Sequence, residues 1–112
     1  MNFKLFSRLY SEALECETLE LFISERGWQG WMEGFESDQI VEVLSKIYSL
    51  ANSDLSSSRA MSRAEFSRQY YIPIRTLEDW DSSKRTAPIY VKLLLDYTLL
   101  MDILFPGNED EF

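Results

Sequence analysis

The basic side chains of this chain are concentrated in one stretch. Residues 61–92 carry six lysines and arginines against four acidic residues, a net charge of +2. The segments on either side, 1–60 and 93–112, each have a net charge of −5, and the whole chain of 112 residues has a net charge of −8. Guanidinium and ammonium groups bind phosphate oxygens, so a basic cluster is the footprint expected of a nucleic-acid-binding surface. The six basic residues are Arg63, Arg68, Arg75, Lys84, Arg85 and Lys92.

The residue types that support catalysis or metal binding are mostly missing. Histidine is absent, which removes the commonest general base and the commonest metal ligand. The acidic residues lack the Asp-x-Asp-x-Asp-Gly spacing of a calcium loop, and the four glycines form no phosphate-binding loop. The single cysteine, Cys16, cannot form an internal disulfide and fits a reducing cytosol. We therefore expect a protein that is not an enzyme and that needs neither a metal nor a cofactor.

Two short helical patterns joined by a tight turn lie in the middle of the basic stretch. Ser62 and Glu65 have the spacing of a capping box, which predicts the start of the first helix. Pro73 lacks an N–H and disfavours the α conformation in the residue before it, so this helix must end by Tyr71. Pro73 also suits the opening of a second helix, which we expect over 74–82. Two helices with a three-residue turn meet at a steep angle and project the second one outward.

At these residues the chain resembles the Xre-like, or lambda-repressor-like, family of helix-turn-helix regulators. In that family the first motif helix carries Ser-Gln-x-Glu-Leu-Ala, and the recognition helix ends in Ile-x-x-Trp-Glu-x-Gly. The corresponding segments read Ser-Arg-Ala-Glu-Phe-Ser over 62–67 and Leu-Glu-Asp-Trp-Asp-Ser-Ser over 77–83. The resemblance runs without a gap over residues 61–85, about a quarter of the chain. Tyr71 and Ser83 replace the family's two turn glycines, so the resemblance implies a left-handed backbone at both positions.

The resemblance implies DNA binding by the second motif helix. In the family this recognition helix enters the major groove with its N-terminal residues against base edges. Arg75 is then the best candidate for a base contact, because a guanidinium can donate two hydrogen bonds to guanine O6 and N7. Asp79 could accept a bond from a cytosine amine, while Arg63, Lys84 and Arg85 would contact phosphate. The implied DNA-binding set is Arg63, Ile74, Arg75, Thr76, Asp79, Lys84 and Arg85.

The rest of the chain predicts an all-α fold. Residues 2–26 have the pattern of one long amphipathic helix or of two in series. A further helix is expected over 38–51, capped by Ser37 or Asp38, and Pro88 opens the last helix. The apolar residues expected to face inward are Phe3, Phe6, Leu9, Tyr10, Ala13, Leu14, Leu19, Phe22 and Ile23, then Ile40, Val41, Leu44, Ile47, Tyr48 and Ala51, and finally Ile89, Val91, Leu94, Leu95, Thr98, Leu99 and Ile103.

We expect these helices to form one compact domain with three parts. Residues 1–36 are an N-terminal helical extension, 37–105 a lambda-repressor-like helix-turn-helix bundle, and 106–112 an acidic tail. A serine-rich stretch leaves open whether the family's first helix is 53–59 or is supplied by 38–51. The last helix is apolar nearly all round, so it needs a second surface from the N-terminal helix, from a second copy of the chain, or from both.

Two functions from different classes fit these features. The first is a sequence-specific transcriptional regulator that binds double-stranded DNA, as small bacterial and phage regulators of the Xre-like type do. The acidic excess would weaken a monomer on DNA, whereas a symmetric homodimer presents two motifs to a palindromic site. The second is a helix-turn-helix scaffold used for protein binding, an antitoxin-like or inhibitor protein whose acidic surface engages a basic partner; Glu78 and Asp79 favour it. No window of ~20 apolar residues predicts a membrane span, and we expect a cytoplasmic protein.

Overall fold

The computed structural model describes residues 1–59 and 61–105, and this part of the chain is entirely helical apart from its turns. The predicted all-α fold class is confirmed. The predicted acidic tail, 106–112, lies outside the described residues. The elements are α1 (Phe3–Glu15), α2 (Leu19–Arg26), the short 3-10 helix η1 (Gly30–Met32), α3 (Ser37–Ala51), α4 (Leu55–Ser58), α5 (Arg63–Tyr70), α6 (Ile74–Asp81) and α7 (Ile89–Leu104).

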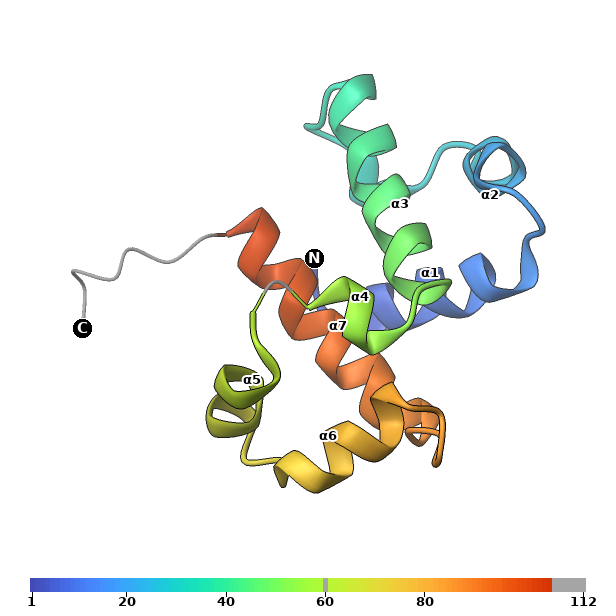
Figure 1. The fold of residues 1–112 in the computed structure, drawn as a ribbon. Coiled ribbons are helices and arrows are strands. Elements are labelled where there is room, and N and C mark those ends of the chain that lie inside the picture. Colours follow the sequence, from blue (N-terminus) through green and yellow to red (C-terminus); the bar gives the residue numbers. More distant parts are fainter. Residues whose placement is uncertain (60, 106–112) are drawn as a thin grey trace.

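The helices form two lobes on either side of α7 (Figure 1). In the N-terminal lobe, residues 1–51, α1 packs against α3 and α7, and α2 packs against α3 and α1. In the motif lobe, residues 61–85, α5 pairs with α6. The single turn α4 lies between the lobes, beside α7 (Figure 1). α7 therefore acts as the shared support of both lobes.

One hydrophobic core connects the two lobes. Phe6 of α1 and Ile47 of α3 have no exposed surface, and they belong to the same cluster as Phe66 of α5 and Leu77 of α6, which are also fully buried. Burying an apolar side chain of this size stabilises the fold by about 1.5–3 kcal/mol. The N-terminal helices are thus packed into the bundle that carries the motif.

The helix boundaries of the motif follow the sequence pattern. The Ser62 hydroxyl accepts a hydrogen bond from the Glu65 amide at 3.1 Å, which caps α5 as predicted. α5 ends at Tyr70, and Tyr71 takes a left-handed conformation with φ 56°. Pro73 stands immediately before the first residue of α6. Residues 2–26 form two helices in series, one of the two alternatives left open by the sequence.

The predicted cap of α3 is wrong by one or two residues. The helix begins at Ser37, so the residue that caps it is Glu36. The Glu36 amide donates to Oε1 of Gln39 at 2.8 Å, which is one bond of a capping box. Ser37 and Asp38 lie inside the first turn of the helix, so neither is the capping residue. α3 then occupies the long helical segment before the motif, and residues 53–59 contain only the single turn α4 with Leu55 buried.

The inward face of α7 differs from the prediction. Its buried residues are Leu95, Asp96, Leu99 and Leu100. A helix that is apolar nearly all round gives no periodic signal to select a face, so packing against α1 and α3 decides which side is covered. Over α1, α3 and α7 together, the side chains predicted to face inward but found exposed are Phe3, Leu14, Val41, Ile89, Leu94 and Ile103.

No helix in the described residues has the length and apolar content that crossing a bilayer requires.

Candidate nucleic-acid interface

The turn between α5 and α6 is held by local bonds and by one contact to α7. The Ile72 amide donates to the Ser67 carbonyl at 3.2 Å, which closes the end of α5. The hydroxyls of Tyr70 and Thr98 are 2.9 Å apart, and this hydrogen bond ties α5 to α7. The start of α6 is therefore fixed relative to the rest of the fold rather than carried on a free loop.

One side of α6 is buried and the other faces solvent. Leu77 is fully buried and Trp80 packs partly against the core. At the opposite side, Ile74 is 46% exposed and Arg75 is exposed. Thr76 is half-buried, and its amide donates to the Pro73 carbonyl in the first turn. Of the four residues predicted to face the groove, Ile74 and Arg75 are thus exposed, whereas Thr76 and Asp79 are partly covered.

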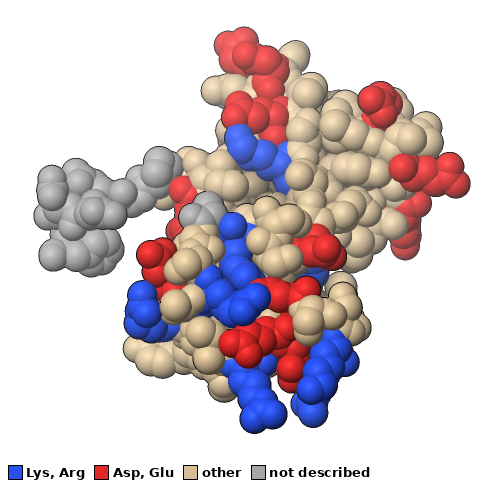
Figure 2. Space-filling view, in the orientation of Figure 1, with Lys and Arg blue, Asp and Glu red and all other residues tan. Residues whose placement is uncertain are grey.

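Three cations of the motif lobe are available for a partner. Arg68, Arg75 and Lys84 are all exposed. Among residues 1–59 and 61–105, no carboxylate oxygen lies within 4.0 Å of their nitrogen atoms. Lysine and arginine side chains gather over the motif lobe in Figure 2, mixed with some acidic ones, whereas the charged side chains visible on the N-terminal lobe are mostly acidic.

Arg63 and Arg59 instead bind carboxylates of α6. Both Oδ atoms of Asp81 accept hydrogen bonds from the Arg59 guanidinium, at 3.0 and 2.6 Å, and Arg63 Nε donates to Oδ2 at 2.9 Å. Arg63 also lies 3.9 Å from Glu78. The bonds from Arg59 are the main cause that lowers the pKa of Asp81, and burial opposes them. Arg63, which was predicted to contact phosphate, is therefore already paired with carboxylates of α6, near the end of the helix opposite to Arg75.

Asp79, Lys84 and Arg85 lie around the end of α6. The Arg85 amide donates to the Asp79 carbonyl at 3.1 Å, and Arg85 Nε is 3.9 Å from the Asp79 carboxylate. Ser83 has φ 61°, so both positions where the resemblance implied a left-handed backbone adopt one. The Arg85 side chain is 78% exposed, and an exposed ion pair of this length contributes little energy. Arg85 can exchange Asp79 for another anion at small cost.

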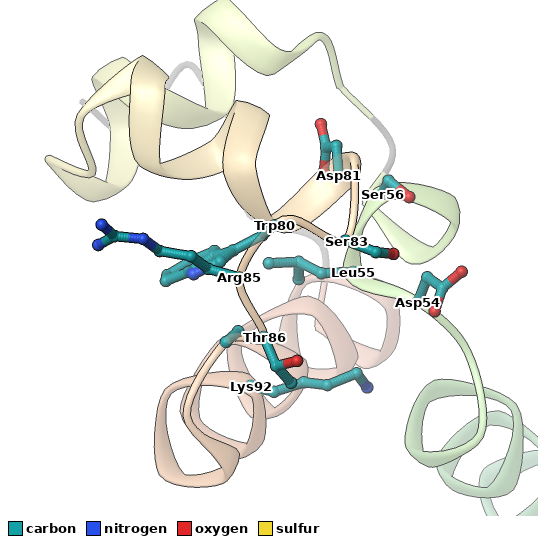
Figure 3. A pocket seen from close by; sticks show the side chains of 10 residues that line it. Asp54, Leu55, Ser56, Trp80, Asp81, Ser83, Arg85, Thr86 and Lys92 are labelled. Carbon is teal, nitrogen blue, oxygen red and sulfur yellow. The ribbon is translucent and has the colours of Figure 1, made fainter.

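A polar hollow of about 270 Å³ lies behind α6. Leu55 and Trp80 line it together with the loop after α6, and the Arg85 guanidinium points away from the other lining residues (Figure 3). Lys92 also lines it, but its ammonium group already donates to Asp96, Tyr10 and the Leu50 carbonyl. The Lys92 ammonium group therefore uses its three N–H groups within the protein and has none left to donate to a ligand in the hollow.

The acceptor of Lys92 is a fully buried carboxylate. Asp96 has no exposed surface, and its Oδ2 accepts from Lys92 at 2.6 Å and from the Tyr10 hydroxyl at 2.7 Å. Burial raises the pKa of Asp96, while the bonds from Lys92 and Tyr10 act in the opposite direction. Burial and the neighbouring carboxylate also raise the pKa of Tyr10. This cluster connects α1, α3 and α7 and serves the fold rather than the interface.

The sequence reasoning missed two residues of the interface region. Arg59 lies outside the matched motif, so no spacing rule linked it to Asp81, twenty-two residues later. The sequence pattern treats Tyr71 only as a turn residue, although its side chain is 93% exposed at the end of α5, three residues before the first residue of α6. Its combination of a bulky side chain with a position that favours glycine was the available signal.

Comparison of the chain with known proteins found no matching protein family, no matching curated protein and no matching solved structure. The resemblance to Xre-like regulators accordingly rests on the residues of the motif and stays a prediction.

Proposed function

We propose that this protein is a sequence-specific DNA-binding regulator of transcription, of the Xre-like helix-turn-helix type, and that it acts as a cytoplasmic homodimer. The observation that carries the proposal is the position of Arg75. It lies on the open side of the first turn of α6, and no carboxylate of the described residues lies within 4.0 Å of it. A guanidinium held in this way can donate two bonds to guanine in the major groove.

The size and support of α6 agree with this role. α6 is a regular helix of eight residues, and an α-helix with its side chains is about 10–12 Å across, a diameter that fits the roughly 12 Å width of the major groove. Leu77 anchors the buried side of α6, and the Arg59–Asp81 bonds hold its C-terminal end. The helix can therefore enter a groove as a rigid element, with Arg75 at its leading end.

The distribution of charge sets the orientation on DNA and favours a dimer. The acidic N-terminal lobe would be repelled by phosphates, so the duplex has to approach the motif lobe. Three available cations in one motif lobe give a small electrostatic contribution to binding. A two-fold symmetric pair doubles it and matches two half-sites about one helical turn apart.

The test is binding of the purified full chain to the DNA immediately upstream of its own gene, with a scrambled duplex of equal length as the control. The proposal predicts a preference for the upstream duplex and an affinity that falls steeply between about 50 and 200 mM salt. Mass measurement in solution, with and without DNA, gives the number of chains in the complex. Equal binding to both duplexes, or binding insensitive to salt, would contradict the proposal.

A second candidate is a protein-binding scaffold. The observation that favours it is the pairing of Arg63 with Asp81 and Glu78 and of Arg85 with Asp79, which mixes both signs of charge over the motif. In this case the acidic surface would engage a basic partner protein. The same assay separates the two candidates, because a scaffold of this kind has no reason to prefer its own upstream DNA.

A further inference from the structure

We propose that Tyr71 is a specificity-determining residue that, together with Ile74, contacts the C5 methyl group of a thymine in the major groove. This inference rests on the proposed DNA-binding function and adds to it a residue outside the implied DNA-binding set. Thymine is the one base whose major-groove edge carries a methyl group, so an apolar contact there distinguishes it from the other three.

The fold does not explain the presence of a tyrosine at position 71. Its side chain is 93% exposed, the highest value among the exposed large apolar side chains of the described residues. A ring this exposed gains little from packing, yet its backbone is left-handed at φ 56°. For a residue other than glycine this conformation is strained. Strain of this kind is retained at sites where the side chain has a function.

Tyr71 lies close to the first turn of α6, the turn that carries Arg75. It caps the C-terminus of α5 and stands three residues before Ile74, the first residue of α6. Ile74 is 46% exposed, so the two residues place apolar surface beside the leading end of the recognition helix. A helix entering the major groove brings this end to the base edges first.

The charges around Tyr71 identify DNA as the occupant. Arg68 precedes it on the last turn of α5 and Arg75 follows it on the first turn of α6. Both are exposed, and within residues 1–59 and 61–105 neither has a carboxylate within 4.0 Å. An exposed aromatic residue in a segment flanked in sequence by two available cations complements a polyanion with apolar groups between its phosphates, and the two positive charges would repel a basic protein surface.

The experiment removes the methyl group and the ring separately. In a duplex that the wild-type protein binds, each thymine is replaced in turn by deoxyuridine, which lacks only the C5 methyl group. One replacement should weaken the wild-type protein about fourfold, the fold-change that corresponds to one buried methyl group. Tyr71→Gly should lose affinity for the thymine duplex and show a smaller further loss at that replacement than wild type, because Ile74 keeps its part of the contact. Tyr71→Phe should behave as wild type, because the contact uses the ring.

Folding is checked by thermal unfolding of the same variants. Tyr71→Gly should melt no lower than wild type, since glycine adopts this backbone without strain. A loss of DNA affinity then reports the contact rather than unfolding. Tyr90→Ala, which removes a 66% exposed tyrosine outside the motif, is the matched control and should leave DNA affinity unchanged.

Two results would overturn the inference, and the second of them would also overturn the proposed function. If Tyr71→Gly binds as tightly as wild type, or if both give the same deoxyuridine profile, Tyr71 makes no such contact while the proposed function stands. If the wild-type protein itself shows no salt-sensitive DNA binding, the proposed function fails and this inference fails with it.

Discussion

Arg59 and Asp81 join the end of α4 to the end of α6 by two hydrogen bonds, 3.0 and 2.6 Å long. Their side chains are 7% and 11% exposed, so the pair is held largely out of water. The Arg59 guanidinium also lies over the Phe66 ring, 5.6 Å from its centroid. This arrangement fixes the C-terminal end of α6 against the preceding segment and against α5.

Replacing Asp81 by asparagine should destabilise the fold by about 3 kcal/mol. The change leaves the Arg59 charge buried without its counter-ion, which is the costly way to break a buried pair. Chemical unfolding of the variant against wild type measures the difference. Asp79→Asn is the matched control on the same helix. Within the described residues, the one ion pair of Asp79 is the 3.9 Å contact to exposed Arg85, so a change of about 0.5 kcal/mol or less is expected. Equal effects of the two substitutions would show that Arg59 does not depend on Asp81.

The same pair predicts how stability depends on pH. Hydrogen bonding from Arg59 lowers the pKa of Asp81 below that of an aspartate in the unfolded chain, which is about 3.9. The unfolded state therefore binds a proton more readily at this residue, and the stabilisation is complete above that value and is lost as the pH falls through the lower folded pKa. The difference in unfolding free energy between wild type and Asp81→Asn should shrink below about pH 4. A constant difference down to strong acid would contradict the assignment.

The helices of the motif could be predicted because their signals are local. Ser62, Glu65 and Pro73 act through bonds to near neighbours, and the structure places the ends of α5 and α6 where those residues require. The exposed position of Arg75 also follows from the sequence, because Leu77 two residues later belongs to the buried side of the same helix.

The features that the sequence did not predict depend on contacts between distant segments. Leu94 and Ile103 of α7 are exposed although they resemble its buried residues, because the packing of α1 and α3 selects the face. The Arg59–Asp81 bonds join residues far apart in the chain, and Asp96 was counted only as an acidic charge of the C-terminal region although it is fully buried. Periodicity and capping rules contain no information on such pairings.

Replacing Tyr10 by phenylalanine should destabilise the fold by about 1–3 kcal/mol. The hydroxyl donates to the fully buried Asp96 carboxylate and accepts from Lys92, so its removal deprives two charged groups of a partner. Tyr97→Phe is the control, because in the part of the chain that the structure describes the Tyr97 hydroxyl makes one long bond, 3.5 Å, to the Met1 carbonyl. Chemical unfolding should show a clear loss for the first variant and a change of about 0.5 kcal/mol or less for the second. A negligible loss at Tyr10 would mean that a water molecule replaces the hydroxyl.

If the proposed function holds, Arg75 and Lys84 should affect DNA binding in different ways, because the proposal assigns the first to base edges and the second to phosphate. Arg75→Ala should cost about 1–3 kcal/mol on the preferred duplex and relax the base preference at one position, since it removes two bonds to one guanine. Lys84→Ala should weaken all duplexes nearly equally and reduce the slope of log affinity against log salt by about 1. Titrations of both variants against a set of single-base substitutions, at several salt concentrations, separate the two effects. If Arg75→Ala lowered affinity equally for every sequence, Arg75 would be a phosphate contact, and the specificity of α6 would have to come from other residues.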